Sequence, residues 1–239
     1  MRPTLSGVVR RWWCEVQPQE GLWRTGWRFA RALWEFLRES TPSRRRQRYG
    51  DVDYDWDYRV DTTGATVGWR DRLIGMFLSS YEPTEPTAFR EMLSSLQIPF
   101  EQFTFVDLGC GKGRTLLMAS DFPFRRVVGV EILSELYRIA QQNIARYKAG
   151  SQTCFHVECV CADAREFPFP PEPIVVYLFN PLPEPGLAQV LSNLEASLAN
   201  CPRQAYIVYH NPLLEHVLAG SKTLRKLRGN DQYALYGNT

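Results

Sequence analysis

FVDLGCGKGRTLLMAS, residues 105–120, joins an apolar run to a helical pattern through three closely spaced glycines. Gly109, Gly111 and Gly113 alternate with Cys110 and Lys112. Glycine adopts backbone angles that other residues avoid, and it lets a ligand approach the main chain closely. A strand, a glycine loop and a helix in this order predict a site where a ligand contacts backbone atoms.

The alternation of strands and helices continues on both sides of this stretch. Apolar runs predict strands within residues 103–108, 125–131, 154–163, 173–180 and 204–210. Helical periodicity predicts helices within 81–96, 111–120, 133–147 and 186–198, and a short helix from Pro212. Residues 222–228 and 232–237 are close enough in sequence to pair as a terminal antiparallel hairpin. We therefore expect an α/β fold, a doubly wound, mostly parallel seven-stranded sheet with helices on both faces, plus an N-terminal helical extension.

The chain is expected to divide into a basic amphipathic helical arm (1–48), an irregular segment (49–80) and one large domain (81–239). The arm holds eleven Arg and four acidic residues. Residues 22–38 predict a helix with arginines on one narrow face and Trp, Phe and Leu over the rest. Such a helix packs on the domain or on a second copy of the chain, or lies on a membrane surface. Its arginines either keep the arm solvated or bind an anionic partner.

The segment after the arm combines Pro, Gly and Asp in a pattern that discourages regular structure. Residues 51–61 carry five Asp against one Arg, which indicates a solvated acidic loop. Asp53, Asp55 and Asp57 alternate as in a calcium loop, but the required glycine and distal Glu are missing. The cysteines and histidine within 154–161 lack the paired spacing of structural zinc. We therefore expect no bound metal ion.

Composition is that of an ordinary globular protein, with 44% hydrophobic residues and a net charge of +2. No apolar run approaches the ~20 residues that a membrane helix needs. The N-terminus lacks the uninterrupted apolar core of a signal peptide. Six cysteines without a regular framework indicate a reducing compartment. The expected location is the cytoplasm.

Two common ligands of glycine loops do not fit this one. A triphosphate loop needs Lys followed by Ser or Thr after its last glycine, whereas Lys112 stands between glycines. A dinucleotide loop has its third glycine inside the helix, where this chain has Arg114. Asp107, two residues before the first glycine, would also be unfavourable beside a pyrophosphate. An acid at this position suits a ligand that carries positive charge.

Asp107-Leu-Gly-Cys-Gly-Lys-Gly resembles the first motif of the class I, seven-strand S-adenosylmethionine (SAM) methyltransferases. The resemblance runs from about residue 81 to the C-terminus, and VVGVEI, CADARE and LFNPLPEP follow in the family's order. It implies SAM as the cofactor and methyl transfer to an acceptor as the activity. YEPTEPT, with DLGCGKGR and YLFNP, is also similar to bacterial members likened to the non-SET lysine methyltransferases.

The resemblance implies a role for each motif. Glu131, followed by Ile132, would hold the ribose hydroxyls, and Asp163 with Ala164 would contact the adenine. Asn180 would lie beside the transferable methyl group. The remaining implied cofactor contacts are Asp107, Gly109, Cys110, Gly111, Gly113, Tyr81 and Thr84, the last two of which also fit a simple turn before a helix. The four motifs follow neighbouring strands, whose carboxyl ends bind ligands in open α/β sheets.

The fourth motif departs from the pattern of enzymes that methylate planar amide or amine nitrogens. Asn180 and Pro181 match, but Leu182 and Pro183 replace a second proline and an aromatic residue, which disfavours adenine and glutamine acceptors. A protein side chain or a small molecule is expected as the acceptor ahead of nucleic acid. His210, after the fifth strand, is either a general base or a histidine that only ends a strand. A catalytically silent SAM-binding sensor or scaffold is the alternative function.

Overall fold

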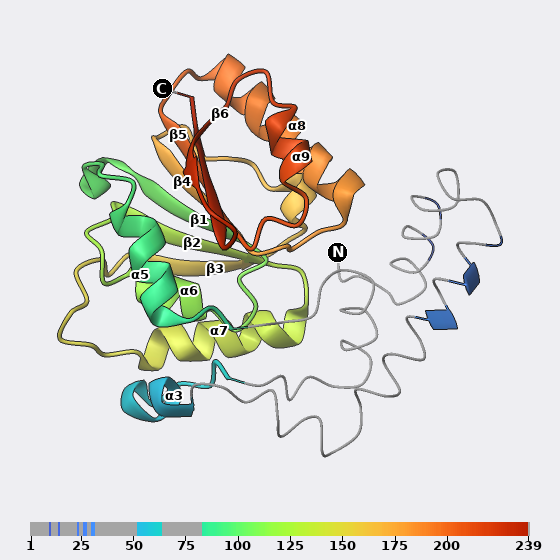
Figure 1. Cartoon of the computed structure of the whole chain (residues 1–239). Helices are drawn as coiled ribbons and strands as arrows, with labels where there is room; N and C mark the ends of the chain where they lie inside the picture. Colours follow the sequence, from blue (N-terminus) through green and yellow to red (C-terminus); the bar gives the residue numbers. More distant parts are fainter. Residues whose placement is uncertain are drawn as a thin grey trace.

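The computed structural model describes residues 52–63 and 83–238, together with residues 10, 14, 23, 26, 27, 30 and 31. A single seven-stranded sheet forms the centre, in the order β3-β2-β1-β4-β5-β7-β6 (Figure 1). The parallel strands are β1 (Thr104–Leu108), β2 (Arg126–Glu131), β3 (Val157–Cys161), β4 (Ile174–Leu178) and β5 (Ala205–His210). Their crossovers go outward in both directions from β1, so the β1/β4 boundary is the switch point of the sheet.

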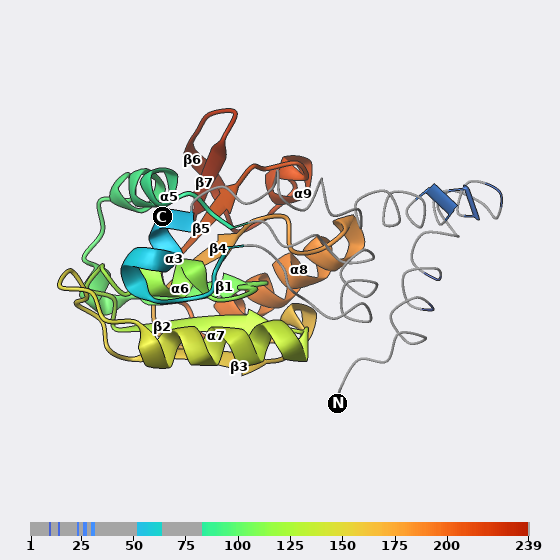
Figure 2. The same ribbon diagram turned by 90° about the horizontal axis from the view of Figure 1, so that it is seen from below.

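Helices cover both faces of the sheet (Figures 1 and 2). One face carries α5 (Pro86–Ser94), α6 (Arg114–Ala119) and α7 (Ser134–Arg146). The other carries α8 (Glu184–Asn200) and α9 (Glu215–Ala219). Two short 3-10 helices, η1 (Phe100–Gln102) and η2 (Ala164–Glu166), complete the connections. The α/β fold expected from the alternating pattern is confirmed.

The two faces bury different kinds of side chain because successive strand residues point to opposite sides. The α5–α7 face is rich in aromatic rings, including Phe89, Phe105 and Tyr177, whose centroids lie 5.5–6.1 Å apart. The α8–α9 face is mainly aliphatic, and Val106 and Leu178 are buried there. Tyr177 brings its hydroxyl group into the aromatic layer, and that buried oxygen needs a hydrogen-bond partner.

The terminal hairpin closes the sheet as the sequence predicts. Strands β6 (Arg225–Gly229) and β7 (Tyr233–Gly237) pair antiparallel, and β7 pairs antiparallel with β5. All residues of β7 are buried, whereas all residues of β6 are exposed. The edge strand therefore presents Arg225, Lys226 and Arg228 to solvent, and such charges discourage pairing with another sheet edge.

The prediction of an irregular segment through residues 49–80 is wrong for part of that range. Val52–Tyr58 forms helix α3, and residues 59–63 follow it back to the domain. The rings of Tyr58 and Tyr147 lie 5.1 Å apart, and Tyr54 is 8% exposed. Packing against Tyr147, the residue that follows α7, therefore stabilises a helix that Asp-rich composition disfavours. Residues 64–82 lie outside the described residues.

The arm is described only at single positions. Trp23, Gly26, Trp27, Ala30 and Arg31 are helical, and the rest of the predicted helix at 22–38 lies outside the described residues. The division of the chain at residues 48 and 80 stays a prediction. Within the part that the structure describes, no helix is long and apolar enough to cross a membrane.

Candidate functional site

The glycine loop follows β1 at the carboxyl edge of the sheet. Gly109, Gly111 and Gly113 have φ values of +88°, +56° and +82°, a region that L side chains rarely adopt. A Cβ atom on Gly109 would lie 2.7 Å from the Cβ of Pro181, and one on Gly113 would lie 3.2 Å from the Cβ of Ala140. The loop therefore needs glycine both for its backbone angles and for its close approach to neighbouring elements.

Glu131 connects the end of β2 to this loop. Its Oε2 accepts a hydrogen bond of 2.9 Å from the Gly111 N–H, and its Oε1 accepts one of 2.7 Å from the Leu133 N–H. The side chain is 5% exposed. The carboxylate that the resemblance assigns to the ribose is therefore held against the glycine loop. Ile132, the next residue, is half-buried.

Asp107 lies beneath the loop at the end of β1. It is 3% exposed and accepts a hydrogen bond from the Thr115 hydroxyl. Burial raises the pKa of Asp107 to about 7, the Thr115 hydrogen bond opposes this shift, and the charge of Glu131 adds to it. The side chains of Asp107 and Glu131 are therefore close enough, beside the glycine loop, to interact electrostatically.

The third motif is arranged differently from the first two. Asp163 precedes η2 and caps it by accepting from the Arg165 N–H at 3.0 Å. Its carboxylate also accepts from the guanidinium of Arg165, at 2.7 Å for Nη2. Ala164 begins η2 and is half-buried. The pairing with Arg165 is an observed contact of Asp163, and the contact with adenine stays a prediction.

Asn180 and Asn211 adopt left-handed backbone angles after β4 and β5, with φ of +45° and +48°. The Asn180 Nδ2 donates to the Asn211 carbonyl at 2.7 Å, and its Oδ1 accepts from the Tyr209 hydroxyl at 2.8 Å. These contacts join the two strand ends. The side chain predicted to lie beside the methyl group thus shapes the rim of the site through internal hydrogen bonds.

His210 belongs to a buried hydrogen-bonded chain that sequence reasoning missed. The Tyr177 hydroxyl lies 2.8 Å from His210 Nδ1 and 2.9 Å from the Thr84 hydroxyl. The ring of Phe179 lies 4.1 Å from the His210 ring, centroid to centroid. Burial lowers the pKa of His210 to about 4, so its imidazole is neutral at pH 7. Only the folded sheet brings Thr84, Tyr177 and His210 together.

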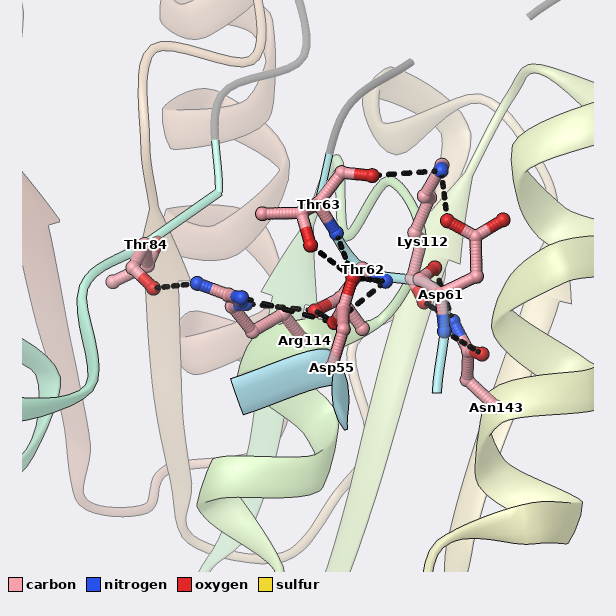
Figure 3. Close-up of polar contacts among 8 residues, drawn as sticks. All are labelled: Asp55, Asp61, Thr62, Thr63, Thr84, Lys112, Arg114 and Asn143. Carbon is pink, nitrogen blue, oxygen red and sulfur yellow. Dashed lines mark hydrogen bonds and ion pairs between the residues drawn. The ribbon is translucent and has the colours of Figure 1, made fainter. Parts of the chain in front are cut away.

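A second network that the sequence did not predict surrounds Lys112 of the glycine loop and Arg114 at the start of α6 (Figure 3). Lys112 is fully buried, with Nζ 2.5 Å from Asp61 Oδ1. Arg114 is 2% exposed, and its Nε donates to the Thr62 hydroxyl at 2.8 Å. The excess of Asp in residues 51–61 could have predicted this network, because a buried cation needs an acidic partner.

Other predicted features fall outside these contacts. Tyr81 lies outside the described residues, whereas Thr84 is buried at 3% exposure. The Sγ atom of Cys110 points into the core, 3.4 Å from that of Cys159. In the described part of the chain, no group of three or more His, Cys, Asp or Glu side chains could hold a metal ion.

Comparisons with known proteins agree with this arrangement. The family model that matches is described as a methyltransferase domain and covers residues 105–200, from β1 to the end of α8. A protein-lysine N-methyltransferase of Saccharolobus islandicus (strain REY15A) is 39% identical over 67 residues, which are 28% of this chain and 41% of that protein. The chain thus matches about two-fifths of the length of this curated relative.

Solved structures include similar arrangements of chain. Magnesium protoporphyrin IX methyltransferase from Synechocystis PCC 6803, with bound SAM, is 12% identical with a TM-score of 0.45; the match covers 63% of this chain and 75% of that one. An RNA methyltransferase from Salinibacter ruber, in complex with S-adenosyl-L-homocysteine, is 20% identical with a TM-score of 0.40; the match covers 65% and 91% of the two chains.

The sheet order and the glycine loop after β1 define an open α/β sheet, and sheets of this kind bind ligands at the switch point. The family match over residues 105–200 identifies that unit as a methyltransferase domain. The chain therefore contains a methyltransferase domain over residues 105–200.

Proposed function

We propose that this chain transfers a methyl group from SAM to the side-chain amine of a protein lysine. The observation that carries the proposal is the buried Glu131 carboxylate, held on the glycine loop by the Gly111 N–H at 2.9 Å. A carboxylate at this place can accept hydrogen bonds from ribose hydroxyls. The lysine acceptor is supported by the relative from Saccharolobus islandicus, which is a protein-lysine N-methyltransferase.

In this proposal SAM lies along the carboxyl ends of β1, β2 and β4. Gly109 is exposed on the loop, so its backbone is open to the ligand. Ile132 and Ala164 would flank the adenine and ribose, while Asp163 and Arg165 would form one side of the adenine site. The acidic side chain of Asp107 suits a ligand whose methionine end carries an ammonium and a sulfonium group.

Methyl transfer needs a neutral acceptor in line with the bond between sulfur and the methyl carbon. The amine lone pair forms the new N–C bond, the S–C bond breaks, and its electron pair stays on sulfur. Because a lysine side chain is an ammonium at pH 7, it loses one proton to solvent before this attack, and the methylated product remains a charged ammonium. A histidine with a pKa of about 4 is a weak base at pH 7. We therefore assign His210 to orienting the acceptor by hydrogen bonding, with Phe179 as the adjoining apolar wall.

Two measurements test this proposal. Calorimetry with SAM, S-adenosylhomocysteine and NADH should detect binding of the first two ligands only. Transfer of a tritiated methyl group into a fractionated host lysate should label protein, and acid hydrolysis should release methyllysine. Label in RNA or in small molecules would overturn the lysine acceptor. SAM binding with no label in any fraction would favour the silent sensor or scaffold, and absence of SAM binding would overturn both.

The proposal also covers the cellular location of the chain and the role of the arm, residues 1–48. Six cysteines without a regular framework support a reducing compartment, and we propose the cytoplasm. Trp23 and Trp27 are 91% and 64% exposed, which supports a contact surface on the arm. Sedimentation of the chain alone and with anionic vesicles would separate self-association from membrane binding.

A further inference from the structure

The segment of residues 52–63, here called the clamp segment, is held by the two cations that belong to the start of α6 and its glycine loop (Figure 3). Lys112 Nζ lies 2.5 Å from Asp61 Oδ1 and 3.3 Å from the Thr63 carbonyl. Lys112 is fully buried, while the Asp61 side chain is 51% exposed. The clamp segment therefore provides the carboxylate beside an ammonium group that has no exposed surface.

Arg114 makes the second attachment. Its Nε donates to the Thr62 hydroxyl at 2.8 Å, and its Nη2 lies 3.8 Å from Asp55 Oδ1. The guanidinium carbon stands 4.6 Å from the centre of the Tyr54 ring, a cation–π distance. Asp55 in turn accepts from the Thr62 N–H at 2.9 Å, which closes the turn after α3. The Arg114 side chain therefore contacts both helix α3 and the turn that follows it in the clamp segment.

Asn143 of α7 joins the clamp segment to the loop backbone. Its Oδ1 accepts from the Asp61 N–H at 2.9 Å, and its Nδ2 donates to the Asp61 carbonyl at 2.8 Å. The same Nδ2 donates to the Lys112 carbonyl at 2.9 Å. Asn143 is 1% exposed. One buried amide therefore contacts the main chain of both segments, and in the glycine loop it does so at the peptide that joins Lys112 to Gly113.

We propose that the clamp segment fixes the glycine loop in the conformation that binds SAM, with Asp61 and Asn143 as its positioning residues. The inference rests on the proposed function, because it assumes that SAM binds at this loop. A loop with three glycines has many conformations to lose on binding. Contacts that remove those conformations beforehand lower the cost of binding, and affinity rises accordingly.

Ligand binding at the loop and the stability of the clamp segment must affect each other reciprocally. If the clamp segment favours the binding conformation, then a ligand bound at the loop must stabilise the clamp segment by the same factor. The Asp61, Thr62 and Thr63 amides all donate to side chains, so their hydrogen exchange reports on the clamp. S-adenosylhomocysteine should slow exchange at residues 61–63 as well as at the loop. Amides of β7, far from the loop along the sheet, should not respond.

The decisive variant is Asp61→Asn in the full chain, which keeps the side-chain size and removes the charge beside Lys112. The matched control is Asp57→Asn, because Asp57 is exposed on α3. Asp61→Asn should speed amide exchange at residues 109–113 and weaken S-adenosylhomocysteine by about tenfold, the scale of about 1.4 kcal/mol. Asp57→Asn should leave both quantities at their wild-type values. Asn143→Ala should act like Asp61→Asn, and if it fails to fold, Asp61→Asn still decides.

The outcomes separate this inference from the proposed function. Wild-type affinity and loop exchange in Asp61→Asn would overturn the inference while leaving SAM binding intact. Uniformly faster exchange across the sheet would mean general destabilisation, and would also overturn it. If the wild-type chain binds neither SAM nor S-adenosylhomocysteine, the proposed function fails and the inference fails with it. Locally faster exchange together with weaker binding supports both.

Discussion

The Tyr177 hydroxyl lies 2.8 Å from Nδ1 of His210 and 2.9 Å from the hydroxyl of Thr84. Tyr177 is 1% exposed, and it comes from the middle of the sheet, whereas His210 ends β5 at the rim of the site. A phenol has one proton to donate, so the direction of this chain is coupled to the tautomer of the His210 ring. The core of the sheet therefore controls which nitrogen of His210 carries hydrogen.

Replacing Tyr177 by Phe should remove that control. The buried Thr84 hydroxyl and His210 Nδ1 would both lose their partner, which costs about 1–3 kcal/mol of unfolding free energy. The nitrogen chemical shifts of His210 should move toward a different tautomer ratio. Tyr236→Phe is a matched control, because the Tyr236 hydroxyl also bonds a side chain, Glu215 at 3.0 Å, on the other face. Unchanged His210 shifts in Tyr177→Phe would contradict the prediction.

The pH dependence of stability should carry a contribution from His210. Its pKa is about 4 when folded and 6.5 ordinarily, so the unfolded chain binds more protons between these values. The His210 contribution to stability is therefore full above about pH 6.5 and is lost as pH falls toward 4. Urea unfolding of wild type and His210→Gln should show a shallower rise with pH in the variant. Parallel curves for the two proteins would refute this.

Asp107 acts in the opposite direction over part of the same range. Its pKa is raised to about 7 from 3.8, so its contribution is full at low pH and is lost as pH rises through 7. Because Asp107 is present in both proteins, the difference between wild type and His210→Gln isolates the histidine.

Glu131 and Asp163 should differ in their importance for the cofactor. Glu131→Ala removes a charged acceptor and should weaken SAM roughly ten- to a hundredfold. Asp163→Asn keeps an acceptor oxygen, so its effect should be smaller. Neither carboxylate is assigned to the methyl group, and S-adenosylhomocysteine should therefore weaken in parallel in a calorimetric titration. Wild-type affinity of Glu131→Ala for both ligands would show that the ribose assignment is wrong.

Gly109 should tolerate no side chain. Gly109→Ala places a Cβ 2.7 Å from that of Pro181 at a φ of +88°, and the backbone angle alone costs about 1–2 kcal/mol. The unfolding free energy should fall and SAM should bind more weakly, because the loop must move away from Pro181. Gly150→Ala is the control, since nothing lies within 4 Å of a Cβ there. Equal stability of the two variants in urea would contradict the close approach.

Several features were predictable because they depend on short stretches of sequence. The apolar runs give five parallel strands and the terminal hairpin within a few residues of their observed bounds. The position of Glu131 at the end of β2 was predicted, and it contacts the glycine loop because β1 and β2 are adjacent parallel strands with their carboxyl ends together. Helix α3 was missed because Tyr58 packs on Tyr147 and Arg114 stacks on Tyr54, contacts that no local pattern reveals.

The order of strands and helices and the glycine loop could be predicted from the amino-acid sequence, because hydrophobic period and glycine content act locally. The residues that surround this loop could be identified only in the folded domain. Asp61 and Lys112 are 51 positions apart, and Thr84 and Tyr177 are 93 apart. A charge or hydroxyl group that becomes buried on folding loses its hydrogen bonds to water and needs a partner within the protein. Which partner is in reach depends on the packing of the whole domain.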